Sequence, residues 1–212
     1  MKEIFNTQVV GDVLVKDDQG NILVHKQNAI HPGNMATAIA RGLSNSNNFQ
    51  VFKLKLGNQG TYVDSSQQIV FRPPNTTGVS ADLYNPTYVE VVDDSNAVVG
   101  VGNSVTFTNI PNSTSTRVIV TCVVSANEAV NRPTDQADSA TADNGGLDGV
   151  DATPTEGEFF FDELGLFTAG AGTPDLLNET DELMLSHLVF SPIEHTGNRE
   201  LTIVYSLTIT VS

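Results

Sequence analysis

The sequence contains no tryptophan and a single cysteine, Cys122. One cysteine excludes an internal disulfide bond. Its neighbours in the run RVIVTCVV are mostly apolar, so we expect a thiol that is buried in a strand. A nucleophilic cysteine needs a nearby base and a polar setting, which this run does not offer.

Basic residues are also scarce, with 10 Lys and Arg against 25 Asp and Glu, for a net charge of −15. Binding to a phosphate backbone depends on Lys and Arg that release counterions, and anionic lipid repels an acidic surface. No apolar run approaches the roughly 20 residues that span a bilayer, and the first residues lack the apolar core of a secretory signal. We expect a soluble protein that is made in the cytoplasm and has no direct nucleic-acid or membrane partner.

The motifs of common enzymes and metal sites are missing. The glycine-rich stretch 57–61 is not followed by the Gly-Lys-Ser/Thr of a phosphate-binding loop, and there is no Gly-x-Ser-x-Gly elbow. The histidines are scattered, without the i, i+4 pair of a helical zinc site: His25, His31, His187 and His195. We therefore predict no catalytic residue, no metal and no cofactor, while carboxylate pairs that only the fold brings together stay open.

One adjacent pair of acids, Asp162 and Glu163, follows three phenylalanines in a strand-like run. Neighbours on a strand point to opposite faces, so the two carboxylates are not expected to act together as an acid and a base. The one that faces inward needs partners, because a buried charge must be compensated. We expect it to cap backbone N–H groups or to meet an arginine such as Arg199 or Arg117.

The composition is rich in Thr, Ser, Asn, Val and Gly, which is typical of strands and tight turns. Runs with strand periodicity recur along the whole chain without regular alternation with helices. They lie at residues 9–16, 22–26, 51–56, 87–92, 104–108, 116–125, 158–167, 183–190 and 201–211. The pattern predicts a single all-β domain over residues 1–212, an antiparallel β-sandwich of the jelly-roll kind.

Two segments allow finer predictions. Residues 32–43 carry apolar side chains at four-residue spacing behind an opening proline, which predicts one short helix that lies as a lid over an edge or end of the sheet. Residues 51–56 alternate apolar and basic side chains, which predicts a strand whose lysines, Lys53 and Lys55, face solvent.

Residues 73–86 contain too many proline, glycine and asparagine residues for a central strand and predict a long ordered loop. Loops of this length often carry contacts. Our candidate interface residues lie here: Pro73, Pro74, Asn75, Leu83 and Tyr84.

Residues 127–158 form a long acidic excursion with almost no large apolar side chains. A solvated surface loop is the expected form, and ordering against a neighbouring subunit is an alternative. Calcium is a third possibility, because hard oxygen ligands are present although their spacing does not match an EF-hand. These candidates are Asp135, Asp138, Asp143, Asp148 and Asp151.

Several stretches resemble segments of uncharacterised virion structural proteins of marine tailed bacteriophages. They are DQGNILVHKQNAIH (18–31), LGNQGT (56–61), DLYNPTY (82–88), FDELGL (161–166) and LSHLVFSPI (185–193) followed by NREL (198–201). The resemblance implies a non-enzymatic virion protein whose partners are other virion proteins, such as the major capsid protein, and copies of itself.

Within a virion, an acidic β-sandwich suits the outer surface, away from the packaged genome. The fold class also resembles the jelly-roll decoration, or cement, proteins that clamp neighbouring capsomers, so we expect a capsid decoration protein that forms a cyclic oligomer, a trimer. A tail, baseplate or head–tail connector component is the alternative. A glycan-binding fibre module is a second alternative, although the chain has no Trp and only four Tyr to line a sugar groove.

Overall fold

The structure is a computed structural model, and it describes residues 6–44, 50–92, 102–126, 144–145, 158–169, 181–196 and 198–212. Nearly all regular structure in these ranges is β. The elements in chain order are β1 (Thr7–Asp17), β2 (Ile22–Ile30), α1 (Pro32–Leu43), β3 (Val51–Gly57), β4 (Thr61–Val63), β5 (Ile69–Phe71), β6 (Pro86–Val91), β7 (Ser104–Asn109), β8 (Ser115–Val124), β9 (Asn144–Gly145), β10 (Glu158–Thr168), β11 (Met184–Thr196) and β12 (Leu201–Val211).

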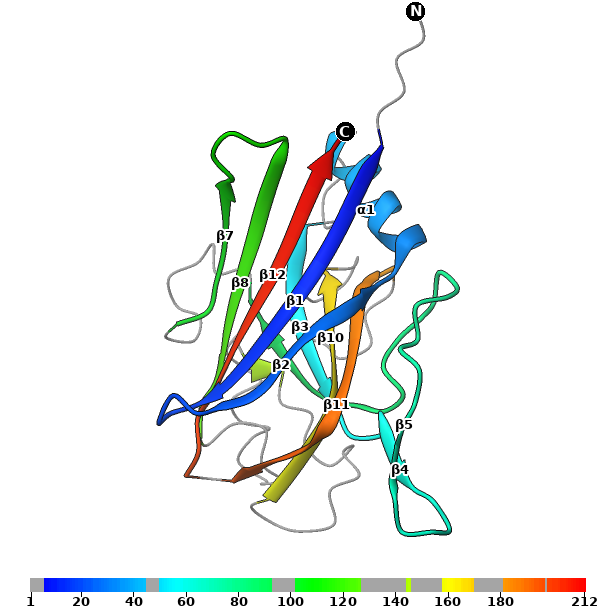
Figure 1. Ribbon diagram of the computed structural model, residues 1–212, viewed down its shortest axis with the longest axis vertical. Coiled ribbons are helices and arrows are strands. Elements are labelled where there is room, and N and C mark those ends of the chain that lie inside the picture. The colour runs from blue at the N-terminus through cyan, green and yellow to red at the C-terminus, as the bar shows by residue number, and fades with distance from the viewer. Residues whose placement is uncertain are drawn as a thin grey trace, which may run out of the picture.

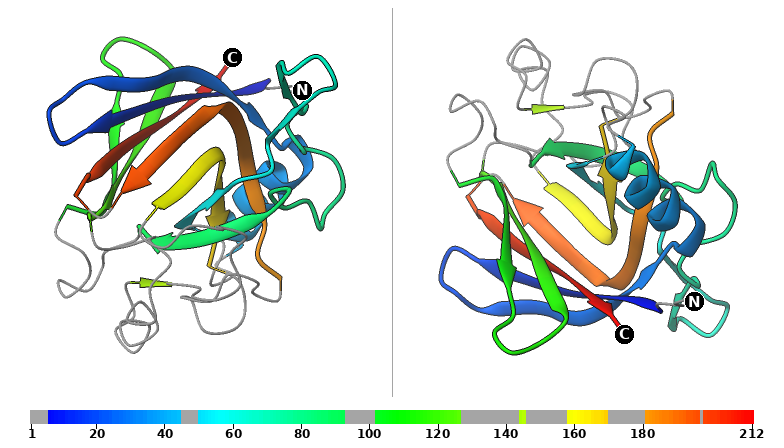
Figure 2. Two further views of the ribbon diagram at one scale, coloured as in Figure 1. Left: turned by 90° about the horizontal axis from the view of Figure 1, so that it is seen from below. Right: turned by 90° about the horizontal axis from the view of Figure 1, so that it is seen from above.

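The strands form one 10-stranded sheet in the order β7-β8-β12-β1-β2-β11-β10-β3-β6-β9, and β4 and β5 form a separate two-stranded sheet. All strand pairs are antiparallel. The large sheet curls on itself, so that its two halves enclose an interior (Figures 1 and 2). The predicted all-β, antiparallel, sandwich-like fold with one short helix is therefore confirmed.

The core lies between the two halves of the sheet. Val13 of β1 is paired in register with Tyr205 of β12, and both are fully buried. Leu54 of β3 and Leu166 of β10 belong to the same hydrophobic cluster, so that distant parts of the chain meet in one interior. Cys122 of β8 is buried in this cluster, as its flanking residues predict.

The first two strands form the predicted hairpin, and its turn is held by one carboxylate. Asp17 Oδ1 accepts hydrogen bonds from the backbone N–H groups of Gln19 (3.1 Å) and Asn21 (2.8 Å). Gly20 takes a positive φ of 81°, a conformation that glycine adopts at little cost.

Helix α1 spans the predicted residues and begins with a histidine cap. His31 Nδ1 accepts a hydrogen bond from Asn34 N at 3.1 Å, which satisfies one free N–H of the first turn. The helix lies at the end of the sheet near the first residues of β1 (Figure 1). Met35 packs into the core, whereas Ile39 and Leu43 are 37% and 85% exposed. The apolar stripe is therefore only partly covered.

The prediction that the lysines of β3 face solvent is wrong, because Lys53 and Lys55 are both fully buried. Lys53 Nζ lies 2.8 Å from Glu182 Oε2, and Lys55 Nζ contacts both Glu182 and Asp82, the latter at 3.2 Å. Period-two alternation correctly separates the lysines from the leucines. It does not show that distant acidic segments cover the lysine face and neutralise it.

Most of the acidic excursion lies outside the described residues, as do all five aspartates considered for calcium. Within it, only β9 and the last residue, Glu158, are described. Val89 of β6 pairs with Gly145, so that β9 forms one edge of the large sheet.

Candidate interaction site

Both members of the acidic pair on β10, Asp162 and Glu163, are buried. Asp162 is 4% exposed and Glu163 is fully buried, so both carboxylates are shielded from solvent and both need compensating partners. The pairing of β10 with β11 shifts register between Phe161 and Glu163, which marks an irregularity in the ladder at this point. Segments outside the sheet cover Asp162 and Glu163, and both carboxylates accept backbone N–H groups, as predicted for an inward-facing acid.

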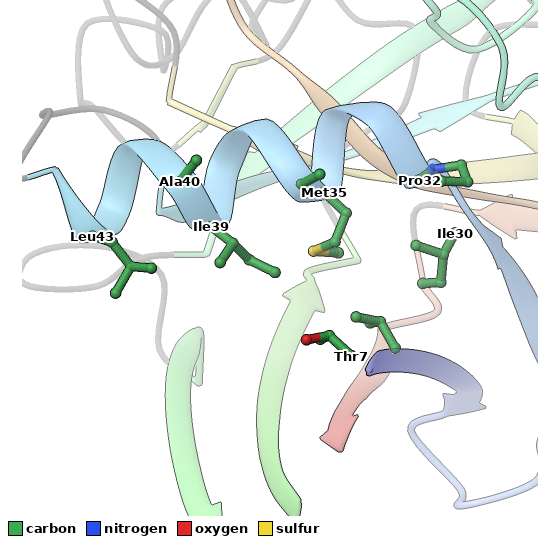
Figure 3. A pocket seen from close by; sticks show the side chains of 9 residues that line it. Thr7, Ile30, Pro32, Met35, Ile39, Ala40 and Leu43 are labelled. Atoms are coloured by element: carbon green, nitrogen blue, oxygen red, sulfur yellow. The ribbon is translucent and has the colours of Figure 1, made fainter. Parts of the chain in front are cut away.

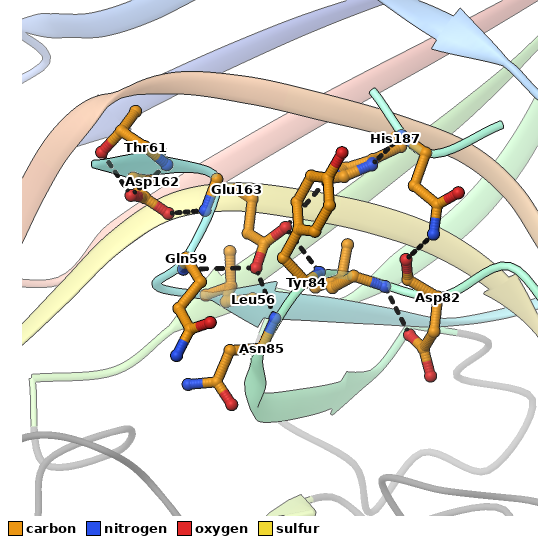
Figure 4. A network of polar contacts seen from close by, with 12 residues as sticks. Leu56, Gln59, Thr61, Asp82, Tyr84, Asn85, Asp162, Glu163 and His187 are labelled. Carbon is orange, nitrogen blue, oxygen red and sulfur yellow. Dashed lines mark hydrogen bonds and ion pairs between the residues drawn. The ribbon is translucent and has the colours of Figure 1, made fainter. Parts of the chain in front are cut away.

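Asp162 holds the chain where it leaves β3 for β4. Its Oδ1 accepts from Gly60 N at 2.8 Å, and its Oδ2 accepts from Thr61 N at 2.8 Å and from Thr61 Oγ1 at 2.5 Å (Figure 4). Burial raises the pKa of this carboxyl above its ordinary value, and the hydrogen bonds from Thr61 and Gly60 oppose that rise. Gly60 has no room for a side chain, because an added Cβ would lie 2.8 Å from the carbonyl oxygen of Asp162.

Glu163 holds a second segment. Its carboxylate accepts from Asn85 N at 2.9 Å, from Tyr84 N at 3.0 Å and from His187 Nε2 at 3.0 Å (Figure 4). His187 Nδ1 in turn accepts from Asn75 N at 2.8 Å. A backbone N–H only donates, so Nδ1 carries no proton and Nε2 donates to the glutamate. Both nitrogens of this imidazole are occupied, which leaves neither to act as a general base.

The segment held by Glu163 is the predicted ordered loop, residues 73–86. Tyr84 Oη donates to Pro73 O at 2.7 Å, and Asn75 Nδ2 donates to Asp82 O at 3.0 Å. Pro73 and Pro74 are exposed, and Asn75 and Tyr84 are partly exposed. Leu83 is only 5% exposed and packs with Phe167 and Met184, so it supports the loop from within instead of offering a contact surface.

The segment held by Asp162 is a hairpin that projects from the body of the molecule (Figure 1). Its strands pair Tyr62 with Val70 and Val63 with Ile69. Four large apolar side chains stay uncovered on it: Tyr62 is 49% exposed, Val63 61%, Ile69 51% and Phe71 45%. We call these residues the hairpin surface. An isolated two-stranded hairpin is marginal in water, so its order depends on the anchor at Asp162 and on packing against β11.

Cationic side chains flank the hairpin surface. Lys26 Nζ lies 5.0 Å from the ring centroid of Phe71. The guanidinium carbon of Arg72 lies 5.8 Å from the ring centroid of Tyr62 and 4.9 Å from that of Tyr84. Arg72 Nε is buried and has no hydrogen-bond partner among the described residues. Arg72 therefore lies between the hairpin surface and the edge of the 73–86 loop, with its guanidinium near one tyrosine ring of each.

A second apolar feature is a pocket of about 480 Å³ between α1 and the start of β1 (Figure 3). Its lining includes Val9, Ile30, Met35 and Ile39, and Thr7 contributes a hydroxyl. The lining contains no ionisable side chain. The pocket can take an apolar group, but its lining cannot supply acid–base chemistry.

The described part of the chain contains no cluster of three or more His, Cys, Asp and Glu side chains placed to hold a metal ion. Within the same residues, no helix is long and apolar enough to cross a membrane. The remaining histidines make structural contacts: His25 Nε2 lies 3.1 Å from Asp12 Oδ1 at the surface, and His195 is buried beside Phe161.

The predicted strands do not include the hairpin surface. A signal for this hairpin is nevertheless present in the sequence, as two short apolar runs, at 61–63 and 69–71, that flank a turn. Asp64 Oδ1 accepts from Ser66 N and Gln68 N, and Gln67 takes a positive φ of 62°. The two arginines predicted as possible partners of the acidic pair bond elsewhere: Arg199 donates to Glu194 O and Arg117 donates to Thr208 Oγ1.

Comparison with protein-family models, curated proteins and solved structures finds no match to this chain.

Proposed function

We propose that this chain is a non-enzymatic structural subunit of a tailed-phage particle that works through protein–protein contacts. The observation that carries the assembly role is the hairpin surface, an exposed apolar hairpin held in one conformation by a buried carboxylate. Exposed apolar groups that are ordered rather than buried are typical of interaction sites. Pre-ordering them lowers the entropy lost on association.

The buried polar groups support the same proposal. Asp162 and Glu163 each have their oxygens occupied by backbone N–H groups or by His187, and these contacts position a hairpin and a loop. Such a network rigidifies a surface and leaves neither of these two carboxylates free to transfer a proton. This use of acidic residues suits a building block better than a catalyst.

The placement in a phage virion rests on the resemblance of the chain's turns and strands to virion proteins. Capsid decoration is our leading assignment, because a net charge of −15 keeps free subunits soluble and away from packaged DNA. A tail, baseplate or connector component is the alternative.

The test is to locate the protein on purified virions with gold-labelled antibody and electron microscopy. Label spread evenly over the head is the expected result for a decoration protein. Label confined to the tail or to one vertex moves the assignment to a tail or connector component. Particles without label, when a control shows that the antibody reaches the folded protein, contradict the virion assignment.

A further inference from the structure

We propose that the hairpin surface binds a second copy of this chain head to tail, with Arg72 and Lys26 receiving acidic side chains from the β1–β2 and β11–β12 turns of that copy. This inference rests on the proposed function as an assembling subunit. It adds the partner, the two surfaces and the charge pairing that joins them.

The hairpin surface combines apolar and cationic groups, which narrows the choice of partner. Val63 and Ile69 project from its two strands, while Lys26 and Arg72 stand over its aromatic rings. Arg72 is half-buried, with its guanidinium carbon 5.8 Å from the ring centroid of Tyr62 and 4.9 Å from that of Tyr84. No ion pair joins it to a carboxylate of the described residues, so the part of the guanidinium edge that stays exposed is open to an acidic partner. A carboxylate is the group that matches such an edge.

A chain with 25 acidic and 10 basic residues is itself a partner of complementary charge. Two of the basic residues, Lys53 and Lys55, are buried against Glu182 and contribute no positive charge to the surface. Copies of this protein therefore repel one another over most of their surface. A basic-flanked apolar patch is where a second copy meets the least repulsion.

The matching acidic surface lies at the β1–β2 turn and at the connection between β11 and β12, two strands that lie on either side of the β1–β2 hairpin in the sheet. Asp18, Glu194 and Glu200 are exposed there, and we call them the turn surface. The register of Asp17 with Leu201 places Asp18 and Glu200 at the same end of adjacent strands. Lys16 and Arg199 are half-buried nearby, and Arg199 is turned toward Glu194 O at 3.0 Å.

The two surfaces lie on opposite sides of the molecule. Figures 1 and 2 both place the β1–β2 turn across the body from the β4–β5 hairpin. A symmetric pairing of two hairpin surfaces would put Lys26 and Arg72 against their own copies. Because like charges oppose that arrangement, the contact is heterologous, and heterologous contacts that close give rings. A closed ring is therefore the expected assembly, and the resemblance to decoration proteins implies that it has three subunits.

The experiment measures the oligomeric state of the full chain by native mass spectrometry and light scattering at low salt. The wild type is expected to form a ring. Arg72→Glu and the apolar variant Val63→Ser/Ile69→Ser are each expected to weaken association by roughly tenfold or more. Arg117→Glu on β8 makes the same charge change, and Phe107→Ser on β7 removes an apolar side chain that is 73% exposed. Both controls are expected to associate like the wild type.

A charge exchange tests the pairing itself. Asp18→Lys/Glu200→Lys alone is expected to dissociate the ring, and combining it with Arg72→Glu/Lys26→Glu in one chain is expected to restore it. Circular dichroism of every variant confirms that it is folded before its mass is interpreted. A monomeric wild type, equal effects of Arg72→Glu and Arg117→Glu, or no restoration by the exchange would each overturn the proposal. A monomeric wild type that still labels virions leaves the proposed function intact, so the two failures are distinguishable.

Discussion

At the scale of single residues, two aspartates that cap backbone N–H groups, Asp162 and Asp17, have pKa values shifted in opposite directions. Asp162 lies inside the protein, where loss of water disfavours its charged form and raises its pKa. Asp17 also caps backbone groups, but its pKa is lowered, chiefly by the hydrogen bond that it accepts from the Asn21 side chain. The two residues therefore contribute to stability in different pH windows.

We predict that Asp162 titrates above 3.8 and Asp17 below it, measured from the carboxyl carbon resonances of the folded protein by NMR. The folded state holds the proton of Asp162 more tightly than the unfolded chain does. Its contribution to stability is therefore complete below 3.8 and is lost as the pH rises through the folded pKa. The contribution of Asp17 is complete above 3.8 and is lost as the pH falls through its folded pKa. Equal midpoints for the two carboxyls would contradict this assignment.

At the scale of elements, the β4–β5 hairpin is ordered by groups that lie outside it. Arg72 N donates to Gly60 O at 2.8 Å, and Thr61 is held by Asp162. Gly60 makes this approach possible, because its Cα packs directly against the backbone and side chains of β10 and β11. The order of the hairpin surface thus depends on this glycine contact with the sheet as well as on the Asp162 anchor.

We predict that Gly60→Ala lowers the free energy of unfolding by about 1–3 kcal/mol, because the added Cβ would lie 2.9 Å from Glu163 Cβ and 3.0 Å from Val189 Cγ1. Gly42→Ala is the matched control. Its Cβ meets nothing within 4 Å, and in a helix the change is expected to raise stability by about 0.5–1 kcal/mol. Urea denaturation of both variants measures the difference, and a Gly60→Ala protein as stable as the wild type would show that this approach is not tight.

At the scale of the whole molecule, the two halves of the curled sheet share one interior. Strand β2 pairs with β1 on one side and with β11 on the other, so that the sheet continues from one half to the other. The hydrophobic cluster includes Leu56 from one half and Leu207 from the other. A shared core of this kind couples the stability of both halves.

We predict that Leu56→Ala and Leu207→Ala each lower the free energy of unfolding by about 2–5 kcal/mol, because both leucines are at most 2% exposed. Each variant is expected to unfold in one transition, with coincident curves from circular dichroism and tyrosine fluorescence. Two separated transitions, with each substitution moving only one of them, would instead indicate two independently folding halves.

The sequence by itself determined the local structure, because strand alternation, turn residues and helix caps act between near neighbours. The first hairpin, helix α1, the 73–86 loop and the buried Cys122 all follow from such patterns. The alternation along β12 likewise places Leu201, Ile203, Tyr205 and Leu207 on one buried face.

Only the tertiary structure decided which polar groups meet across the chain. The lysines of β3 are buried because Asp82 and Glu182 pair with them. The acidic pair of β10 is buried because the segments 59–61 and 84–85 pack over it and donate backbone hydrogen bonds to its carboxylates. Periodicity assigns a side chain to a face but carries no information about what packs on that face. The hairpin surface could not be predicted from local patterns for the same reason, because its order depends on a carboxylate about a hundred residues away in the sequence.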